Sequence, residues 1–445
     1  MMKKKIVEDA REVEVKAEYD VLVIGGGVAG IAASISASRS GARTILIERY
    51  GFLGGMVTAG MVGALCGFFT TGFKKNKIVG GIADKLLEGL RKKGALSEPR
   101  ISKIDPRLAT YRYHPEVFKY VAEQTALQNG VDILFHTLVV DVIRETKDNF
   151  LSGVIVENKA GRFAFLGKII IDATGDGDVA FRAGVLYYLG NENGRLQSLT
   201  TMFRTMDVDL DKISELSTET LRQKLGEARR EGSFDFYRVD PVIGLGIPLG
   251  IVDVNATGIP NLNALDAQEL TKAEIEGRRQ VFEYLNFFRQ TIPGFENAQV
   301  CCIAPQIGIR ETRRIQGKYL LNEDDTLKGV KFDDAIALGA WPVEIHDPET
   351  GKIVWKLLEK EDDYYTIPLR CLIPRDISNL LVAGRCISTT HIAQGSTRVT
   401  AQAFATGDAA GILASQAVES KRDPMDIPPI KIQNKLREQG AILEI

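Results

Sequence analysis

Apolar residues gather in short unbroken runs near both ends of this chain rather than alternating with polar residues. Such runs lie at 19–24, 44–47, 168–172 and 379–383. Unbroken apolar runs are typical of strands that are buried on both faces, as in a parallel sheet covered by helices. Apolar residues at helical spacing follow the first run at 31–39. The pattern therefore predicts an α/β fold built on a Rossmann-like parallel sheet.

A glycine motif separates the first predicted strand from the first predicted helix. Gly25, Gly27 and Gly30 have the spacing G-x-G-x-x-G, and Glu48 ends the second strand. In this setting the three glycines permit a tight turn, a close approach of a pyrophosphate and close packing of the helix. The helix amino terminus attracts the phosphate charge, and the carboxylate accepts hydrogen bonds from a ribose. The motif predicts a dinucleotide site; the plain alternative is a glycine-rich turn that binds nothing.

A second glycine pair favours FAD over NAD as the dinucleotide. Gly54 and Gly55 follow Glu48 closely, within the stretch Arg49 to Met56. Their small size lets the backbone lie against a second phosphate or a ribityl chain, which a plain NAD domain does not need. By itself this stretch is equally well explained as a flexible loop.

Two further segments support the FAD interpretation. A strand-like run at 136–142 follows a helix predicted at 115–129, and we expect a β-meander with arms at 150–156 and 162–165. The run at 168–172 then turns sharply at 173–175, which we place beside the first glycine motif. Residues 175–180 also fit G-x-G-x-x-A, but Asp176 and Asp178 would put negative charge where a pyrophosphate lies. We therefore reject a second dinucleotide site.

The carboxyl-terminal part predicts a buried helix directed at the cofactor. A strand at 379–383 ends at Gly384, and a long helix of small residues is expected at 398–418. Ser396 or Thr397 is the expected N-cap. The positive end of this helix dipole would stabilise negative charge on the N1–C2 edge of a reduced flavin. The alternative is a helix that only packs in the core.

These segments together resemble the bacterial FAD-dependent oxidoreductase family, within the glutathione-reductase and succinate-dehydrogenase flavoprotein superfamily. The resemblance runs over about 18–418, and the stretches 308–321 and 384–399 are its most particular motifs. It differs from the wider superfamily in having Arg385 where many members have an aspartate for the ribityl chain. Many relatives also attach FAD to a histidine near the glycine pair, but the segment 43–64 contains none. We therefore expect FAD to be bound non-covalently.

The motifs and the resemblance together give a set of expected FAD-binding residues. Val139 is expected to contact the adenine through its backbone, and Gly384 to Val399 to contribute contacts to the ring or ribityl chain. The expected cofactor-binding residues are Ile24, Gly25, Gly27, Val28, Ala29, Glu48, Arg49, Gly54, Gly55, Met56, Val139, Ala173, Thr174, Gly175, Gly384, Arg385, Ser396, Arg398 and Val399.

Composition limits the partners. The net charge is −2, which gives no general attraction to nucleic acid or to an anionic membrane. No apolar run is long enough for a membrane span or a signal peptide. The five cysteines have no CxxC spacing, so we expect reduced thiols in a cytoplasmic protein, without an iron–sulfur centre or other metal site.

The length of 445 residues predicts more than one domain. We expect a tail at 1–17 and a discontinuous FAD-binding domain at 18–195 and 370–445. A loop and helix excursion is expected at about 66–112. The segment 196–369 is predicted to form an inserted α+β substrate domain, with helices near 217–231 and 265–291. The stretch 241–253 is expected to be a strand pair or a loop with apolar content.

Three residues are candidates for catalysis. Arg310 belongs to a segment with three arginines in five residues, which would either bind a substrate carboxylate or form an arginine network with Glu311 between domains. We hold these alternatives as equal. His391 and His346 are candidate proton carriers, although purely structural histidines are common.

We therefore expect an enzyme that transfers hydride or electrons between FAD and a small organic substrate. An electron-acceptor partner is a further expectation. The alternatives are a FAD-binding subunit without its own turnover and, less favoured, an NAD-linked dehydrogenase.

Overall fold

The computed structural model describes residues 6–145, 149–248, 250–349 and 352–445. The largest sheet joins both ends of the chain and is formed by β1 (Glu14–Ile24), β2 (Thr44–Ile47), β5 (Asp132–Leu134), β6 (Leu138–Arg144), β7 (Leu151–Asn158), β8 (Gly161–Asp172) and β19 (Leu380–Val382). Among the described residues its order is β5-β2-β1-β8-β7-β6, with β19 also paired to β8. The pairs of β1 with β2 and β8, of β2 with β5 and of β8 with β19 are parallel. β6, β7 and β8 pair antiparallel, as a meander. The predicted parallel sheet with a β-meander is confirmed.

The long strand β8 belongs to both parts of this sheet. Its first half pairs with β7, for example Phe165 with Val154, and its second half pairs with β19, for example Ile171 with Leu381. The meander arm expected at 162–165 and the strand expected at 168–172 are therefore one continuous strand. β1 accompanies it on the other side and begins at Glu14, inside the stretch 1–17 expected to be a tail.

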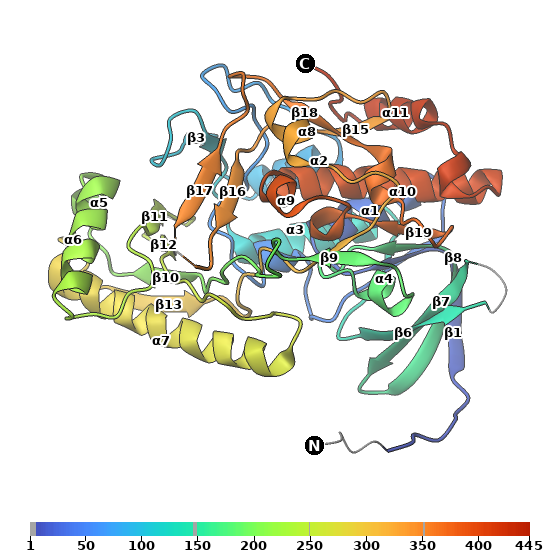
Figure 1. The fold of residues 1–445 in the computed structure, drawn as a ribbon, viewed down its shortest axis with the longest axis horizontal. Helices are drawn as coiled ribbons and strands as arrows, with labels where there is room; N and C mark the ends of the chain where they lie inside the picture. The colour runs from blue at the N-terminus through green and yellow to red at the C-terminus, as the bar shows by residue number, and fades with distance from the viewer. Residues whose placement is uncertain (1–5, 146–148, 249, 350–351) are drawn as a thin grey trace.

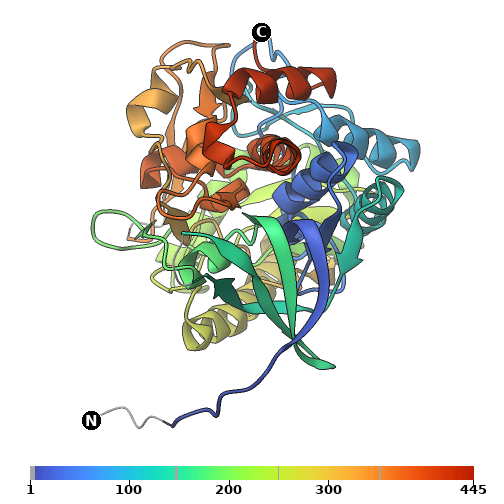
Figure 2. The same ribbon diagram turned by 90° about the vertical axis from the view of Figure 1, so that its right-hand side faces the viewer.

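Two helices of small residues pack against each other and against this sheet. They are α1 (Val28–Arg39) and α10 (Thr400–Ser420), and Figure 2 shows them, in blue and red, above the sheet. A side chain at Gly407 or Gly411 would meet the carbonyl oxygen of Ala29 or Ala33, at 2.1 and 2.2 Å. Glycine at these positions is what lets the two helix backbones approach so closely.

The carboxyl-terminal helix differs from its prediction at its start. Residues 391–397 form a separate short helix, α9 (His391–Thr397), and α10 begins at Thr400 with Val399 as its N-cap. Ser396 and Thr397 are therefore not the N-cap. The hydroxyl of Ser396 instead bonds the carbonyl oxygen of Trp341 and the hydroxyl of Tyr365.

A second layered unit lies to one side of the main sheet (Figure 1). Its antiparallel sheet has the order β11 (Val242–Leu245), β12 (Val252–Asn255), β10 (Phe203–Met206) and β13 (Gln299–Ile303) among the described residues. The long helix α7 (Ala267–Thr291) packs against this sheet. Phe203, Phe236, Tyr284, Phe287 and Phe288 fill the core between these elements. The elements are β10 (Phe203–Met206), α5 (Leu210–Ser214), α6 (Thr218–Arg230), β11 (Val242–Leu245), β12 (Val252–Asn255), α7 (Ala267–Thr291) and β13 (Gln299–Ile303). Both predicted helices of this region are confirmed, and of the two alternatives for 241–253 the strand pair is the one observed.

The remaining elements surround these two units. The helices are α2 (Ile82–Lys92), α3 (Pro115–Gln128), α4 (Asp178–Arg182), α8 (Glu323–Leu327) and α11 (Pro429–Glu438). The two-stranded pairs are β3 (Arg100–Ile101) with β4 (Ala109–Thr110), β9 (Tyr187–Leu189) with β14 (Arg313–Ile315), β15 (Ala335–Gly339) with β18 (Tyr365–Pro368), and β16 (Val343–His346) with β17 (Ile353–Lys356). Short 3₁₀ turns are η1 (Gly55–Val57), η2 (Leu369–Leu372), η3 (Gly384–Cys386) and η4 (Pro424–Asp426).

The hydrophobic core does not follow the expected domain boundary at 369. Ile336, Leu338 and Ile367 lie within the segment 196–369, yet they pack in the main core with β1, β8 and α10. The division of the chain into domains therefore stays a prediction. Among the described helices, none combines the length and the hydropathy that a membrane span requires.

Candidate active site

The first glycine turn leaves a helix terminus open to a cavity. β1 ends at Ile24 and α1 starts at Val28, with Gly27 as N-cap and no side chain of the described chain capping the helix. Gly25 has a φ of 100°, and a Cβ at Gly30 would lie 1.8 Å from the carbonyl oxygen of Gly25. Only glycine fits either position, so the turn is fixed by backbone geometry. The N–H groups of the first helical turn are thereby available to a phosphate.

Glu48 ties the end of β2 to this turn. Its carboxylate accepts the N–H of Gly26 at 2.5 Å and the N–H of Tyr50 at 2.8 Å. Burial raises the pKa of Glu48, while the two N–H groups and Arg49 oppose the rise. The side chain lines the cavity, where a ribose hydroxyl can donate to it. Sequence and structure therefore agree on where this residue lies.

The glycine pair Gly54 and Gly55 packs against the first glycine turn. Gly54 has a φ of 117°, and its N–H donates to the carbonyl oxygen of Gly26 at 2.8 Å. Gly55 faces Gly27, so a Cβ on Gly55 would lie 2.8 Å from the Cα of Gly27. Both turns present bare backbone to the same space. Side chains at these glycine positions would occupy the space between the turns. With glycine there, the space can accept a bulky phosphate-containing cofactor.

The turn after β8 supplies a buried ion pair. Asp176 accepts a hydrogen bond from Arg385 at 2.8 Å and from the hydroxyl of Thr312 at 2.7 Å. Burial alone would raise the pKa of Asp176, but Arg385 holds it below its ordinary value. Asp178 pairs with Arg313 at 2.9 Å. Both aspartates are thus paired with arginines, and the absence of a second dinucleotide site at this turn stays a prediction.

The start of α10 reaches the same cavity. Arg398, Val399, Thr400 and Ala403 line it. The N–H of Ala401 is taken by the carbonyl oxygen of Cys66 at 3.1 Å, so one donor of the first turn is already satisfied. The proposed dipole effect on a flavin stays a prediction. Burial raises the pKa of the Cys66 thiol to about 12, which keeps it protonated.

All of these turns open into one cavity of about 700 Å³. Besides the glycine turns it is lined by residues of the segments 100–104 and 213–218, several of which are exposed. The predicted residues that line it are Gly25, Gly27, Val28, Ala29, Glu48, Arg49, Gly54, Gly55, Met56, Ala173, Thr174, Gly175, Arg310, His346, Gly384, Arg385, Arg398 and Val399.

Four predicted residues lie outside the lining. Ile24 and Val139 are buried within strands. Ser396 is buried, with its hydroxyl held by Trp341 and Tyr365. His391 forms a hydrogen bond through Nδ1 with Glu311 at 2.8 Å. His391 does not line the cavity, so its role as a proton carrier stays a prediction.

A polar cluster lines a further part of the cavity. We call Arg310, Glu344, His346 and Arg398 the polar cluster; all four line the cavity. Nε2 of His346 lies 2.7 Å from Oε1 of Glu344, whose Oε2 accepts the indole N–H of Trp341 at 3.1 Å. Nη2 of Arg398 donates to the carbonyl oxygen of Glu344 at 3.1 Å.

The charges of the central pair follow from their surroundings. Burial and the positive charge of Arg310 lower the pKa of His346 well below 6.5, despite the nearby carboxylate. Burial alone would raise the pKa of Glu344, but the hydrogen bond from His346 and the charge of Arg398 hold it well below its ordinary value. A neutral imidazole therefore donates from Nε2 to an ionised carboxylate. Its Nδ1 is left as a proton acceptor.

The strand pair β16 and β17 explains why Glu344 and His346 of the polar cluster lie on the same face. Glu344 lies opposite Trp355 and His346 opposite Ile353, and all four side chains line the cavity. Sequence reasoning missed Glu344, Trp355 and the adjoining Trp341. The signal for Glu344 was present, because residues two apart in a strand point to the same face.

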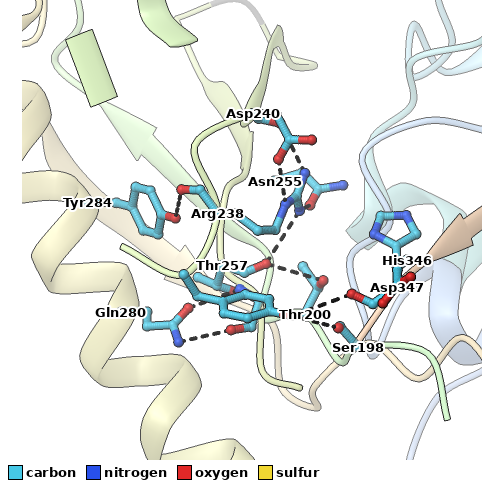
Figure 3. A network of polar contacts seen from close by, with 12 residues as sticks. Ser198, Thr200, Arg238, Asp240, Asn255, Thr257, Gln280, Tyr284, His346 and Asp347 are labelled. Carbon is cyan, nitrogen blue, oxygen red and sulfur yellow. Dashed lines mark hydrogen bonds and ion pairs between the residues drawn. The ribbon is translucent and has the colours of Figure 1, made fainter. Parts of the chain in front are cut away.

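Arg238 is another lining residue that sequence reasoning missed. Its guanidinium donates to Asn255 at 2.9 Å and to Asp240 at 3.2 Å, and the hydroxyl of Tyr284 donates to its carbonyl oxygen at 2.6 Å. Figure 3 shows Arg238 directed at Asn255 and Asp240, with His346 across the gap. Arg238 lies in an irregular segment, which offers no periodic signal.

A family model described as FAD dependent oxidoreductase matches residues 20–436. The chain belongs to the FAD-dependent oxidoreductase family. Its members catalyse FAD-dependent redox reactions, so FAD is the cofactor and the chain is an oxidoreductase. A search of curated proteins found no significant sequence match.

Similar solved structures have low sequence identity to this chain. A flavin-dependent brominase is 13% identical, with a TM-score of 0.50 over 94% of this chain and 83% of the brominase. A geranylgeranyl bacteriochlorophyll reductase-like protein from Thermoplasma acidophilum is 15% identical, with a TM-score of 0.47 over 96% of this chain and 84% of that protein. A p-nitrophenol 4-monooxygenase from Pseudomonas putida is 11% identical, with a TM-score of 0.48 over 95% and 84%.

The residues present fit the cofactor of this FAD-dependent oxidoreductase. The uncapped amino terminus of α1 and the facing glycines Gly27 and Gly55 suit a pyrophosphate. Glu48 suits the adenosine ribose, and the cavity continues past Arg385 to the start of α10. The polar cluster lies in the part of the cavity that these phosphate-binding features do not occupy.

Proposed function

We propose that this FAD-dependent oxidoreductase transfers hydride or electrons between non-covalently bound FAD and a small organic molecule. The observation that carries the proposal is that one cavity is lined both by the glycine turns and by the polar cluster. When bound, FAD accepts or donates a hydride or single electrons. The chain supplies the position of the substrate, the exclusion of water and the transfer of protons.

His346 is the proton carrier that the geometry favours. Its Nε2 donates to Glu344, which fixes the tautomer and the ring orientation. Nδ1 is then free to take a proton from a substrate hydroxyl, amine or acidic C–H group. Arg310 and Arg398 stand beside it and hold the substrate in place by charge-assisted hydrogen bonds.

Two alternatives lose support. The family match favours FAD over a nicotinamide cofactor. It also favours an enzyme over a FAD-binding subunit without turnover, and the polar cluster is a reactive surface that such a subunit would not need. We also propose a cytoplasmic location, since all five cysteines are free thiols. An electron-acceptor partner remains part of the proposal, because the chain offers no metal relay among its described residues.

The test begins with the visible absorbance spectrum of the purified protein. We expect flavin bands that bleach with dithionite under anaerobic conditions, and a yellow supernatant after denaturation and precipitation. A screen of small alcohols, amines and acids should then find a compound that bleaches the same bands. Flavin that stays with the denatured chain would contradict non-covalent binding. Flavin that no small molecule reduces or reoxidises would favour the non-turnover subunit.

A further inference from the structure

Arg310 differs from the other two arginines of its segment. Arg313 pairs with Asp178 at 2.9 Å, and Arg314 lies 3.4 Å from Glu311. Nη1 of Arg310 instead donates to two neutral acceptors, the carbonyl oxygen of Ser198 and the hydroxyl of Thr200, each at 2.7 Å. Within the described part of the chain no carboxylate oxygen comes within 4.0 Å of Arg310. Arg313 and Arg314 therefore form an arginine network with Asp178 and Glu311, whereas Arg310 faces the cavity, where the carboxylate alternative stays a prediction.

The charges around Arg310 leave one positive charge without a counter-ion. Arg238 has Asp240 as its partner at 3.2 Å. Among the described residues, the carboxylate within 4.0 Å of Arg398 is that of Glu344, at 3.9 Å, and the Nε of Arg398 is buried with no hydrogen-bond partner there. Burial and the nearby cations Arg398 and Arg238 lower the pKa of Arg310 to about 9. A guanidinium in such surroundings is costly unless an anion accompanies it.

The surface beside this charge is apolar. Trp341 and Trp355 have ring centroids 6.1 Å apart and line the cavity with Leu108 and Val399. Cys66 adds a protonated thiol to the same cluster. A ligand here meets guanidinium donors on one part and aromatic rings on another. This suits an acid with an apolar body and a single negative charge.

We propose that Arg310, assisted by Arg398, binds the carboxylate of a monocarboxylic acid whose apolar body lies against Trp341 and Trp355. A planar guanidinium matches a carboxylate through two parallel hydrogen bonds. The site places such an acid beside Nδ1 of His346. The inference rests on the proposed function, because it names the class of substrate that the enzyme would bind in this cavity.

The test measures carboxylate binding to the FAD-loaded protein. The probes are benzoate, cyclohexanecarboxylate and hexanoate, with benzamide as an uncharged match to benzoate. Binding is followed by the change in the flavin absorbance bands and by calorimetry. We expect Arg310→Gln to weaken binding of the best carboxylate roughly 10- to 100-fold. Benzamide binding should change less than twofold, and Arg310→Lys should lie between parent and Gln variant because it keeps the charge.

Arg112→Gln is the matched control. Arg112 also lines the cavity, but it donates to the carbonyl oxygen of Gly63 at 2.6 Å and lies near the carboxylate of Asp253. Removing its charge should change carboxylate affinity far less than removing that of Arg310. The flavin content and Tm of each variant show whether it folds.

Three results would overturn the inference. One is a carboxylate affinity that stays within twofold in Arg310→Gln. Another is an Arg310→Gln protein with unchanged carboxylate affinity but a shifted flavin reduction potential, which would place Arg310 on the flavin. The last is a parent protein that binds none of the three acids. A parent that holds flavin which no small molecule reduces or reoxidises contradicts the proposed function instead, and flavin content and reduction are measured separately.

Discussion

At the scale of single residues, the Glu48 carboxylate has a structural task, and we propose that it also binds the adenosine ribose. It holds the first glycine turn through Gly26 and the following loop through Tyr50, and it faces the cavity. We expect Glu48→Ala to raise the Kd for FAD by roughly 10- to 100-fold, because hydrogen bonds to a charged group are lost. The measurement is titration of the apoprotein with FAD, followed by quenching of flavin fluorescence.

Glu48→Gln is the conservative companion to this variant. It keeps the size and one acceptor oxygen but loses the charge, so its Kd should lie between those of parent and Ala variant. A folded Glu48→Ala protein with the FAD affinity of the parent would contradict our placement of the adenosine ribose.

His346 carries a prediction about pH. A base whose pKa lies well below 6.5 is already neutral at neutral pH. The rate of flavin reduction by a substrate should therefore be level from pH 6.5 upward as far as His346 is concerned, and should fall only in more acidic solution. His346→Gln keeps a donor toward Glu344 but has no basic nitrogen, so we expect the rate to fall roughly 10²-fold or more at every pH.

Anaerobic stopped-flow absorbance gives this rate, and flavin content and Tm serve as folding controls. An inflection between pH 6 and 7 that is present in the parent and absent from His346→Gln would mean that the histidine titrates there, against the expected low pKa. A rate within threefold of the parent would remove His346 from proton transfer.

At the scale of elements, the contact between α1 and α10 determines how two helix termini meet the cavity. A Cβ at Gly411 would lie 2.2 Å from the carbonyl oxygen of Ala33. Gly411→Ala must push the helices apart, and we expect a loss of roughly 1–3 kcal/mol in the free energy of unfolding, as for overpacked cores. FAD affinity should fall as well, because both helix starts line the cavity.

Gly226→Ala is the matched control in α6. A Cβ there would meet only Nη1 of Arg230, at 3.6 Å, so the helix should gain roughly 0.5–1 kcal/mol from the better helix former. Thermal unfolding of both variants measures these two changes in stability. If Gly411→Ala is as stable as the parent, the close approach of the two helices is not required by the fold.

Elements with local signals were predicted well from the sequence, and those without such signals were not. α3 begins at Pro115, and α7 begins after the N-cap Asp266. The glycine turns likewise follow from spacing alone. The break between α9 and α10 was missed, since a buried stretch of small residues has no polar face to mark its ends. The continuity of β8 was missed because its two halves have different neighbours.

At the scale of the whole molecule, the candidate site is assembled from distant parts of the chain. Arg310 is held by Ser198 and Thr200, while His346 lies on β16 and Arg398 lies just before α10. From the sequence, Arg310 and His346 were candidates for catalysis and Arg398 was an expected cofactor contact, but only the tertiary fold brings them together. The same fold separates His391 from the cavity, and no local pattern distinguishes that histidine from His346.

The packing of helices also creates a buried carboxyl whose effect on stability depends on pH. Asp408 of α10 accepts a hydrogen bond from Ser36 of α1 at 2.5 Å and faces the N–H of Ile82 at the start of α2. Burial raises its pKa from 3.8 to about 6, although Ser36 and that N–H oppose the rise. The folded state therefore binds the proton more tightly than the unfolded chain does. The resulting stability is present below pH 3.8 and is lost as the pH rises through 6.

Asp408→Asn isolates this effect, because other carboxyls change parent and variant alike. The stability of the variant relative to the parent should increase between pH 4 and pH 7, by roughly 2 to 3 kcal/mol at most for a shift of this size. Urea unfolding at a series of pH values, with FAD saturating in both proteins, gives the difference. A difference that does not vary with pH would show that Asp408 has an ordinary pKa in the folded protein. A difference that falls as pH rises would show that the carboxylate is the favoured form, and that the junction of α1, α2 and α10 is held by charge.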